Sequence, residues 1–96
     1  MNTQEQRIES VADEVRSTLI RKNRDYGDSF AKQYSKYGIM CGIIRMDDKM
    51  SRLETLVSGH EAEVAESIED TLLDLAGYAI LCAVEYRKNK ELTKRG

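Results

Sequence analysis

Acidic side chains recur at helical spacing in the last third of this 96-residue sequence. Glu66, Asp70 and Asp74 are four residues apart, so on a helix their carboxylates would stack along one side. Stacked like charges repel each other, and a bound Mg²⁺ would offset that repulsion, since hard divalent cations take carboxylate oxygens and keep waters for phosphate ligands. A solvated acidic face paired with lysines is the other interpretation.

The complementary cations lie in an earlier stretch. Arg45, Lys49 and Arg52 share one flank of a predicted helix, with Asp48 alongside. Long basic side chains in this position could reach a phosphate, or they could pair with the acidic residues of a neighbouring helix. Asp48 could also serve only as the ion-pair partner of Arg52, which lies one turn later on the same helix.

Residues 22–29 combine cations, an aromatic ring and a glycine. Lys22 and Arg24 precede Tyr26 and Gly27, which offers charge for a phosphate, a ring for a base and a backbone that a ligand can approach closely. Basic residues followed by glycine are also typical of a helix end. The stretch is therefore either a nucleotide-binding loop or an ordinary helix cap.

The apolar pattern predicts an all-α fold, in one domain spanning residues 1–96, with three long helices to carry these residues. Helical spacing extends over residues 3–22, over 29–57 and from residue 61 onwards, and a break at Gly38 would make four helices. The charged residues 87–96 are predicted to fray. The apolar residues spaced for one packed seam in the second helix are Ile39, Ile43, Met46, Met50, Leu53 and Val57.

The last helix is apolar nearly all round over residues 75–84. A helix with this pattern must be covered on every side, and the other helices of so short a chain can hardly supply that cover. A second subunit is the simplest way to cover the remaining apolar side chains of this helix. The sequence therefore predicts a small helical bundle that forms a homo-oligomer.

Composition excludes several classes of function. Lys and Arg number 15 against 17 Asp and Glu, a net charge of −2 that argues against a general nucleic-acid coat, which rests on many uncompensated cations. The apolar runs are shorter than the roughly 20 residues needed to cross a bilayer. Cys41 and Cys82 lie in apolar runs, like small core residues, and the start of the chain lacks a signal peptide, so we expect a cytoplasmic protein.

Three motifs occur in order along the chain. They are KNRDYGDSF at residues 22–30, RMDDKMSRL at 45–53 and ESIEDTLLDLAGYA at 66–79. Together they resemble the nucleotide modification associated domain 1 family of bacteriophages and prophages, over about residues 15–84. Residues 66–79 are also similar to the second acidic helix of the MazG-type and dimeric dUTPase-type pyrophosphatases, all-α enzymes that hold Mg²⁺ against a triphosphate. The cytoplasm implied for a phage-encoded protein is that of the bacterial host.

The resemblance implies that the three motifs form one site. Asp70 and Glu66 are the expected catalytic carboxylates, and a metal-activated water would attack phosphorus. The expected Mg²⁺ ligands are Glu66, Asp70, Asp74 and Asp48. The expected contacts to the nucleotide come from Lys22, Asn23, Asp25, Tyr26, Gly27, Arg45, Lys49 and Arg52.

The resemblance to the pyrophosphatases is incomplete at one position. Those enzymes carry a Glu-x-x-Glu pair on an earlier helix, which neither Glu5 with Glu9 nor Asp13 with Glu14 reproduces. Three functions therefore stay open. The protein hydrolyses a nucleotide with Mg²⁺, it sequesters a nucleotide signal without catalysis in host–phage conflict, or it is an adaptor whose charged residues only pair between helices.

Overall fold

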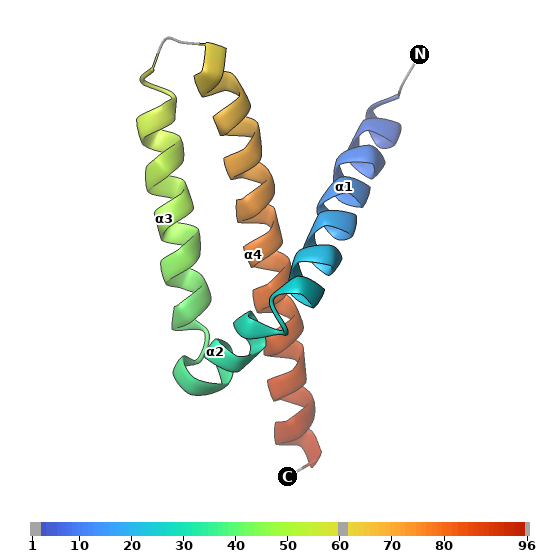
Figure 1. Cartoon of the computed structure of the whole chain (residues 1–96). Coiled ribbons are helices and arrows are strands. Elements are labelled where there is room, and N and C mark those ends of the chain that lie inside the picture. Colours follow the sequence, from blue (N-terminus) through green and yellow to red (C-terminus); the bar gives the residue numbers. More distant parts are fainter. Residues whose placement is uncertain (1–2, 60–61, 96) are drawn as a thin grey trace.

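Over residues 3–59 and 62–95, the computed structural model has four α-helices: α1 (Gln4–Asp25), α2 (Ser29–Tyr37), α3 (Met40–Leu56) and α4 (Ala62–Arg95). It describes the backbone of residues 3–59 and 62–95 and the side chains of 3–59 and 67–92. Helices α3 and α4 run side by side as a hairpin, while α1 crosses α4 and diverges from it toward the N-terminus (Figure 1). The predicted all-α fold is confirmed, with four helices.

The first break in the helical pattern falls between α1 and α2. Helix α1 begins at a capping box, in which the Thr3 side chain accepts from the Gln6 backbone and the Gln6 side chain accepts from Thr3. Beyond its end, Gly27 has the positive φ of 58° that its position in the turn predicts. Asp28 is also left-handed and does not cap α2; its carboxylate instead accepts a hydrogen bond from Asn23 Nδ2 at 2.6 Å.

Gly38 makes the second break, and it divides the predicted middle helix into α2 and α3. Its backbone has φ 71° and ψ −165°, a combination that is essentially restricted to glycine. Its N–H donates to the Tyr34 carbonyl at 2.7 Å, which closes the last turn of α2. The change of direction places α2 below the first turn of α3 and across α4 (Figure 1).

The core lies where α2, α3 and α4 meet. Phe30 and Tyr34 of α2 are buried there with Cys82 of α4, and Met46 of α3 packs against them. Gly42 allows this approach, because a Cβ at that position would overlap the Cys82 thiol. Helices α3 and α4 therefore pack closely where a residue without a side chain faces a small one.

The predicted seam of α3 is wrong in part. Its members Ile39, Ile43 and Met50 are 42–45% exposed and Val57 is 66% exposed, although Met46 does face the core. The close approach at Gly42 turns a neighbouring face of the helix inward, and the predicted seam lies at its edge.

The charged C-terminal stretch, which the sequence predicts to fray, lies in a helix, and its fraying stays a prediction. Helix α4 continues to Arg95. Lys88 pairs with Glu85 at 3.0 Å, and the Lys90 ammonium lies 5.8 Å from the centre of the Tyr86 ring. Contacts one turn apart of this kind support an exposed helix end. In the described part of the chain, no helix combines the length and the apolar character that crossing a bilayer requires.

Candidate functional site

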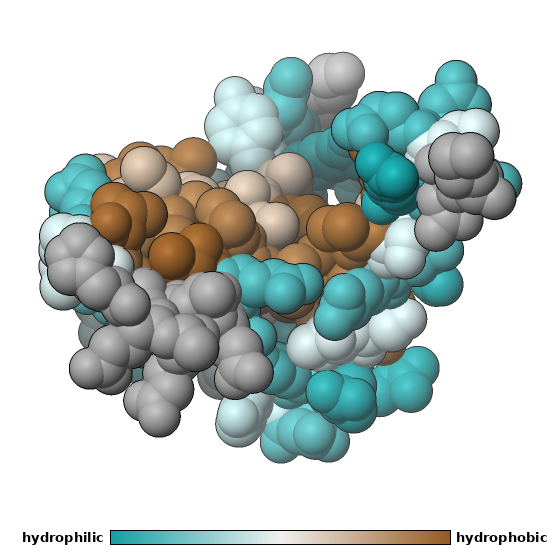
Figure 2. All heavy atoms as spheres, turned by 90° about the horizontal axis from the view of Figure 1, so that it is seen from above, coloured by the Kyte–Doolittle hydropathy of each residue, from teal (hydrophilic) through white to brown (hydrophobic). Residues whose placement is uncertain are grey.

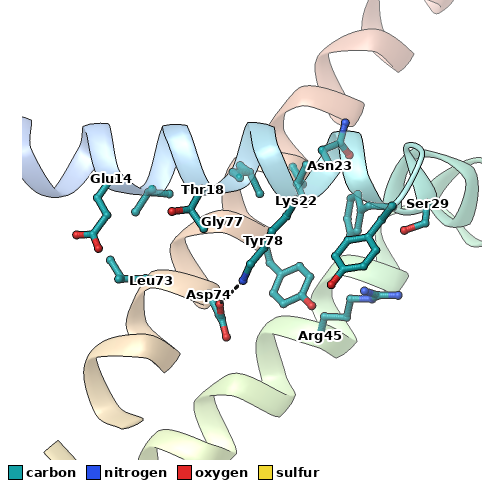
Figure 3. A pocket seen from close by; sticks show the side chains of 15 residues that line it. Glu14, Thr18, Lys22, Asn23, Ser29, Arg45, Leu73, Asp74, Gly77 and Tyr78 are labelled. Carbon is teal, nitrogen blue, oxygen red and sulfur yellow. Dashed lines mark ion pairs between the residues drawn. The ribbon is translucent and has the colours of Figure 1, made fainter. Parts of the chain in front are cut away.

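A pocket of about 290 Å³ opens where α1 crosses α4. Helix α1 lines one wall and α4 the other, and α3 contributes Arg45 and α2 contributes Ser29 and Phe30 (Figure 3). The polar and aromatic side chains that line it are Glu14, Thr18, Lys22, Asn23, Tyr26, Ser29, Phe30, Arg45, Asp74 and Tyr78. Residues from all three sequence motifs therefore meet in one cavity.

Asp74 holds two lysines from different helices. Lys49 Nζ on α3 donates to one carboxylate oxygen at 3.1 Å, and Lys22 Nζ on α1 lies 3.9 Å from the other. Figure 3 shows the Lys22 ammonium directed at Asp74 across the pocket. The carboxylate thus places two cations at the meeting point of α1, α3 and α4.

Arg45 lies close to two aromatic rings. Its guanidinium carbon lies 5.6 Å from the centre of the Tyr78 ring and 5.9 Å from that of Phe30, within the range of cation–π attraction. An N–H of the same group donates to the Gln33 side chain. The remaining N–H groups of a guanidinium fixed in this way can bind an anion in a defined direction.

The rim of the pocket comes from the turn after α1. Asn23 bridges this turn through its bond to Asp28, and Tyr26, which also lines the pocket, is 68% exposed. An exposed ring beside a cavity offers a flat apolar face to a ligand. The turn predicted as either a binding loop or a helix cap therefore contributes to the pocket.

Six of the predicted site residues come together here: Lys22, Asn23, Tyr26, Arg45, Lys49 and Asp74. Lys49 reaches the group through Asp74, and the other five line the pocket. Five more, which are Asp25, Gly27, Asp48, Arg52 and Asp70, are exposed and do not line it. The side chain of Glu66 lies outside the described residues, so its predicted place beside Asp70 stays a prediction.

The carboxylates that the structure describes do not form a preassembled Mg²⁺ centre. Within residues 3–59 and 67–92, no group of three or more His, Cys, Asp or Glu side chains is placed to hold a metal ion. Asp74 is already matched by two ammonium groups, while Asp70 and Asp48 are exposed on separate helices. The negative charge of Asp74 is therefore balanced by Lys22 and Lys49, without a metal ion.

Two ionisable groups in the core beside the pocket are held neutral. Burial raises the pKa of the Tyr34 phenol, and the neighbouring Cys82 and Cys41 thiols raise it further. Burial likewise raises the pKa of the Cys82 thiol. A raised thiol pKa keeps Cys82 protonated, which is the state of a packing residue rather than of a nucleophile.

A comparison with protein families matches residues 22–86 to the family model described as nucleotide modification associated domain 1. This match covers well over half of the chain. The chain belongs to the nucleotide modification associated domain 1 family. No curated protein and no solved structure matches it significantly.

The stretch matched to nucleotide modification associated domain 1 contains most of the pocket but omits part of its α1 wall. Glu14 and Thr18 line the cavity and precede the matched residues. Sequence reasoning missed both, although they lie eight and four residues before Lys22 and so on the same side of α1. It also missed Phe30, although this residue ends the first motif, and Gln33, whose bond to Arg45 no spacing predicts.

Proposed function

We propose that this protein binds a nucleotide in the pocket between α1, α3 and α4. The observation that carries the proposal is the joint presence of cations and aromatic rings in one cavity. Lys22 and Arg45 line it beside the rings of Tyr26 and Tyr78, and Lys49 is bound to the Asp74 carboxylate in its wall. Phosphates need cations and a base needs a flat apolar face, so this combination suits a nucleotide. The name of the family points to the same class of ligand.

The size of the pocket favours a small ligand over a polymer. Its volume of about 290 Å³ is at the lower end of the range usual for small-molecule sites. In Figure 3 the Glu14 carboxylate and the Arg45 guanidinium lie at opposite ends, with Lys22, Asp74 and Tyr78 between them. A ligand with a phosphate at one end and a polar ring at the other can contact both ends at once.

Lys22 is the cation best placed to turn toward an incoming phosphate. Its contact to Asp74 is the longer of the two, 3.9 Å against 3.1 Å, and its side chain is 51% exposed against 24% for Lys49. A half-exposed ion pair contributes at most about 1 kcal/mol, so a phosphate group can compete for the ammonium. Lys49 would meanwhile stay on Asp74 and keep α3 and α4 in place.

Nucleotide hydrolysis is the second candidate, because two carboxylates, Glu14 and Asp74, also line the cavity. An acidic group beside a bound phosphate could hold Mg²⁺ or orient a water molecule. The predicted ligands Glu66, Asp70 and Asp48 would then have to join Asp74 around the ion. Retention of an intact nucleotide and turnover of a nucleotide are distinguished by the products.

The first experiment is incubation of the purified protein with a panel of nucleotides, including cyclic and dinucleotide signals. Mass spectrometry reads both the retained ligand and any product, with Mg²⁺ and with EDTA. We expect one nucleotide to be retained. Lys22→Met should weaken its binding, measured by calorimetry, by about tenfold or more, since a charge-assisted contact is worth roughly 1.5–3 kcal/mol. Lys36→Met, an exposed lysine of α2 outside the pocket, should leave the affinity unchanged.

The possible outcomes separate the three functions. Product formation that stops with EDTA and with Asp70→Asn, in a variant that keeps its far-UV circular dichroism, would establish hydrolysis and make Asp70 part of the metal site. Intact nucleotide retained at one per subunit or per assembly, with no product, would establish sequestration. If the panel yields neither ligand nor product, the proposal is wrong and the charged residues serve interhelical pairing.

A further inference from the structure

Helix α4 has an apolar face that the other helices, as far as the structure describes them, leave largely exposed. Leu72, Ile80 and Val84 are 49%, 43% and 43% exposed, and the alanines at 79 and 83 are exposed as well. Thr71 and Cys82 are buried on the opposite side, toward α3. Part of the apolar surface of this helix thus packs against α3 and against Leu19 of α1, and part of it is left exposed.

Helix α1 contributes a second apolar strip beside this face. Its residues Ile8 and Val11 are 59% and 53% exposed, and they line an open groove with Val15 of the same helix and Ala76 and Ile80 of α4. The groove widens because α1 diverges from α4 (Figure 1). Seen from above, hydrophobic side chains gather in one continuous area bordered by hydrophilic ones (Figure 2).

The area left exposed is close to what a stable dimer buries. A compact monomer of 11.0 kDa is expected to expose about 5,600 Å², whereas this chain exposes 7691 Å². Its radius of gyration is 15.7 Å, against about 12.5 Å for a compact chain of this length. An excess of roughly 2,000 Å² per chain corresponds to the large interfaces of obligate homodimers.

We propose that a second copy of this chain packs on the face formed by α1 and α4, so that these two helices of both copies form a four-helix bundle. A two-fold dimer needs one self-complementary surface, and an apolar groove flanked by two helices meets that need. Charge does not oppose the pairing, because Arg7 is the one charged residue that lines the groove and the net charge is only −2. The exposed apolar residues of α1 and α4 continue the packed core of the chain. This favours a permanent partner such as a second copy over a partner that binds transiently.

The test is the mass of the assembly in solution, measured by light scattering during gel filtration. The wild-type chain should have twice the mass of 11.0 kDa, or a higher multiple. Val11→Arg and Ile80→Arg each place a charge in the middle of the proposed interface, and each should halve the mass or lower the multiple. Leu92→Arg is the matched control: Leu92 is 65% exposed on α4 but outside the groove, so this variant should keep the wild-type mass.

Two results would overturn the proposal. One is a wild-type chain that is monomeric at 100 µM or more, and the other is an assembly whose mass survives both groove substitutions. Val11→Arg is the variant least expected to misfold, since Val11 is 53% exposed in the N-terminal half of α1 and its substitution should leave the helical content intact. Far-UV circular dichroism confirms that content before the masses are compared.

Discussion

Gly42 and Cys82 show how a single missing side chain allows two helices to approach each other. A Cβ at Gly42 would overlap the Cys82 Sγ and come within 3.3 Å of the Phe30 ring, so Gly42→Ala must displace a buried group. We expect it to lower the free energy of unfolding by about 1–3 kcal/mol, the usual cost of overpacking a core. Urea denaturation followed by circular dichroism measures the change.

The matched control for this substitution is Gly77→Ala. A Cβ at Gly77 would meet only Leu19 Cδ1, at an ordinary 3.4 Å, so this variant should be neutral or more stable, because alanine favours a helix by up to about 1 kcal/mol. Adding Cys82→Ala to Gly42→Ala should recover part of the lost stability. A Gly42→Ala variant as stable as wild type would show that α3 and α4 do not meet at this point.

The buried phenol of Tyr34 predicts a loss of stability in alkali. Its pKa is raised in the folded state, chiefly by burial, so the unfolded chain releases the proton at a lower pH. The stabilising contribution is therefore fully present below the ordinary phenol pKa of about 10 and is lost as the pH rises past it. Tyr34→Phe should reduce the fall in unfolding free energy between pH 8 and pH 11.

The control for the pH series is Tyr37→Phe, which removes a phenol that is 68% exposed. This variant should show the same alkaline loss of stability as wild type. The raised pKa of the Cys82 thiol acts in the same direction at a lower pH, so part of the loss should persist in Tyr34→Phe. Equal pH dependence in all three proteins would contradict the burial of Tyr34.

At the scale of the elements, two glycines determine where the chain turns, and they differ in the backbone that they adopt. Gly27 has φ 58° and Gly38 has φ 71° with ψ −165°, and neither has an atom within 4 Å of an added Cβ. Their substitution therefore tests backbone conformation without steric overlap. Gly27→Ala should cost about 1 kcal/mol of unfolding free energy, and Gly38→Ala should cost more, up to about 3 kcal/mol.

Thermal unfolding of the two alanine variants side by side measures this difference. Gly27→Asn serves as the control, because asparagine tolerates the left-handed conformation better than alanine does. It should lie closer to wild type than Gly27→Ala. If Gly38→Ala were the more stable of the two alanine variants, α2 and α3 would not be divided by the turn described here.

At the scale of the whole molecule, the open arrangement of α1 against α4 predicts that stability depends on protein concentration. A folded chain that gains its remaining burial from a second copy becomes more stable by mass action as its concentration rises. The midpoint of thermal unfolding should therefore rise measurably between 1 µM and 100 µM. The Val11→Arg variant should unfold at a lower temperature that is the same at both concentrations.

The sequence alone indicated the all-α class and the two glycines at which the helical pattern breaks. Periodic apolar residues and the glycines at 27 and 38 act within one or two turns of the chain, so their effects follow from neighbours in sequence. The three motifs likewise contain Lys22, Arg45 and Asp74, because the residue types needed for a charged pocket are visible in the sequence.

The tertiary structure decided which of those residues meet. Asp70 and Asp74 look equivalent by spacing, yet only Asp74 faces Lys22 and Lys49, because it lies at the level where α1 crosses α4. The partly mistaken seam of α3 has the same origin, since the close approach at Gly42 selects the face that turns inward. Helix crossing angles and contacts between distant residues arise from packing in three dimensions, which a pattern along one helix does not contain.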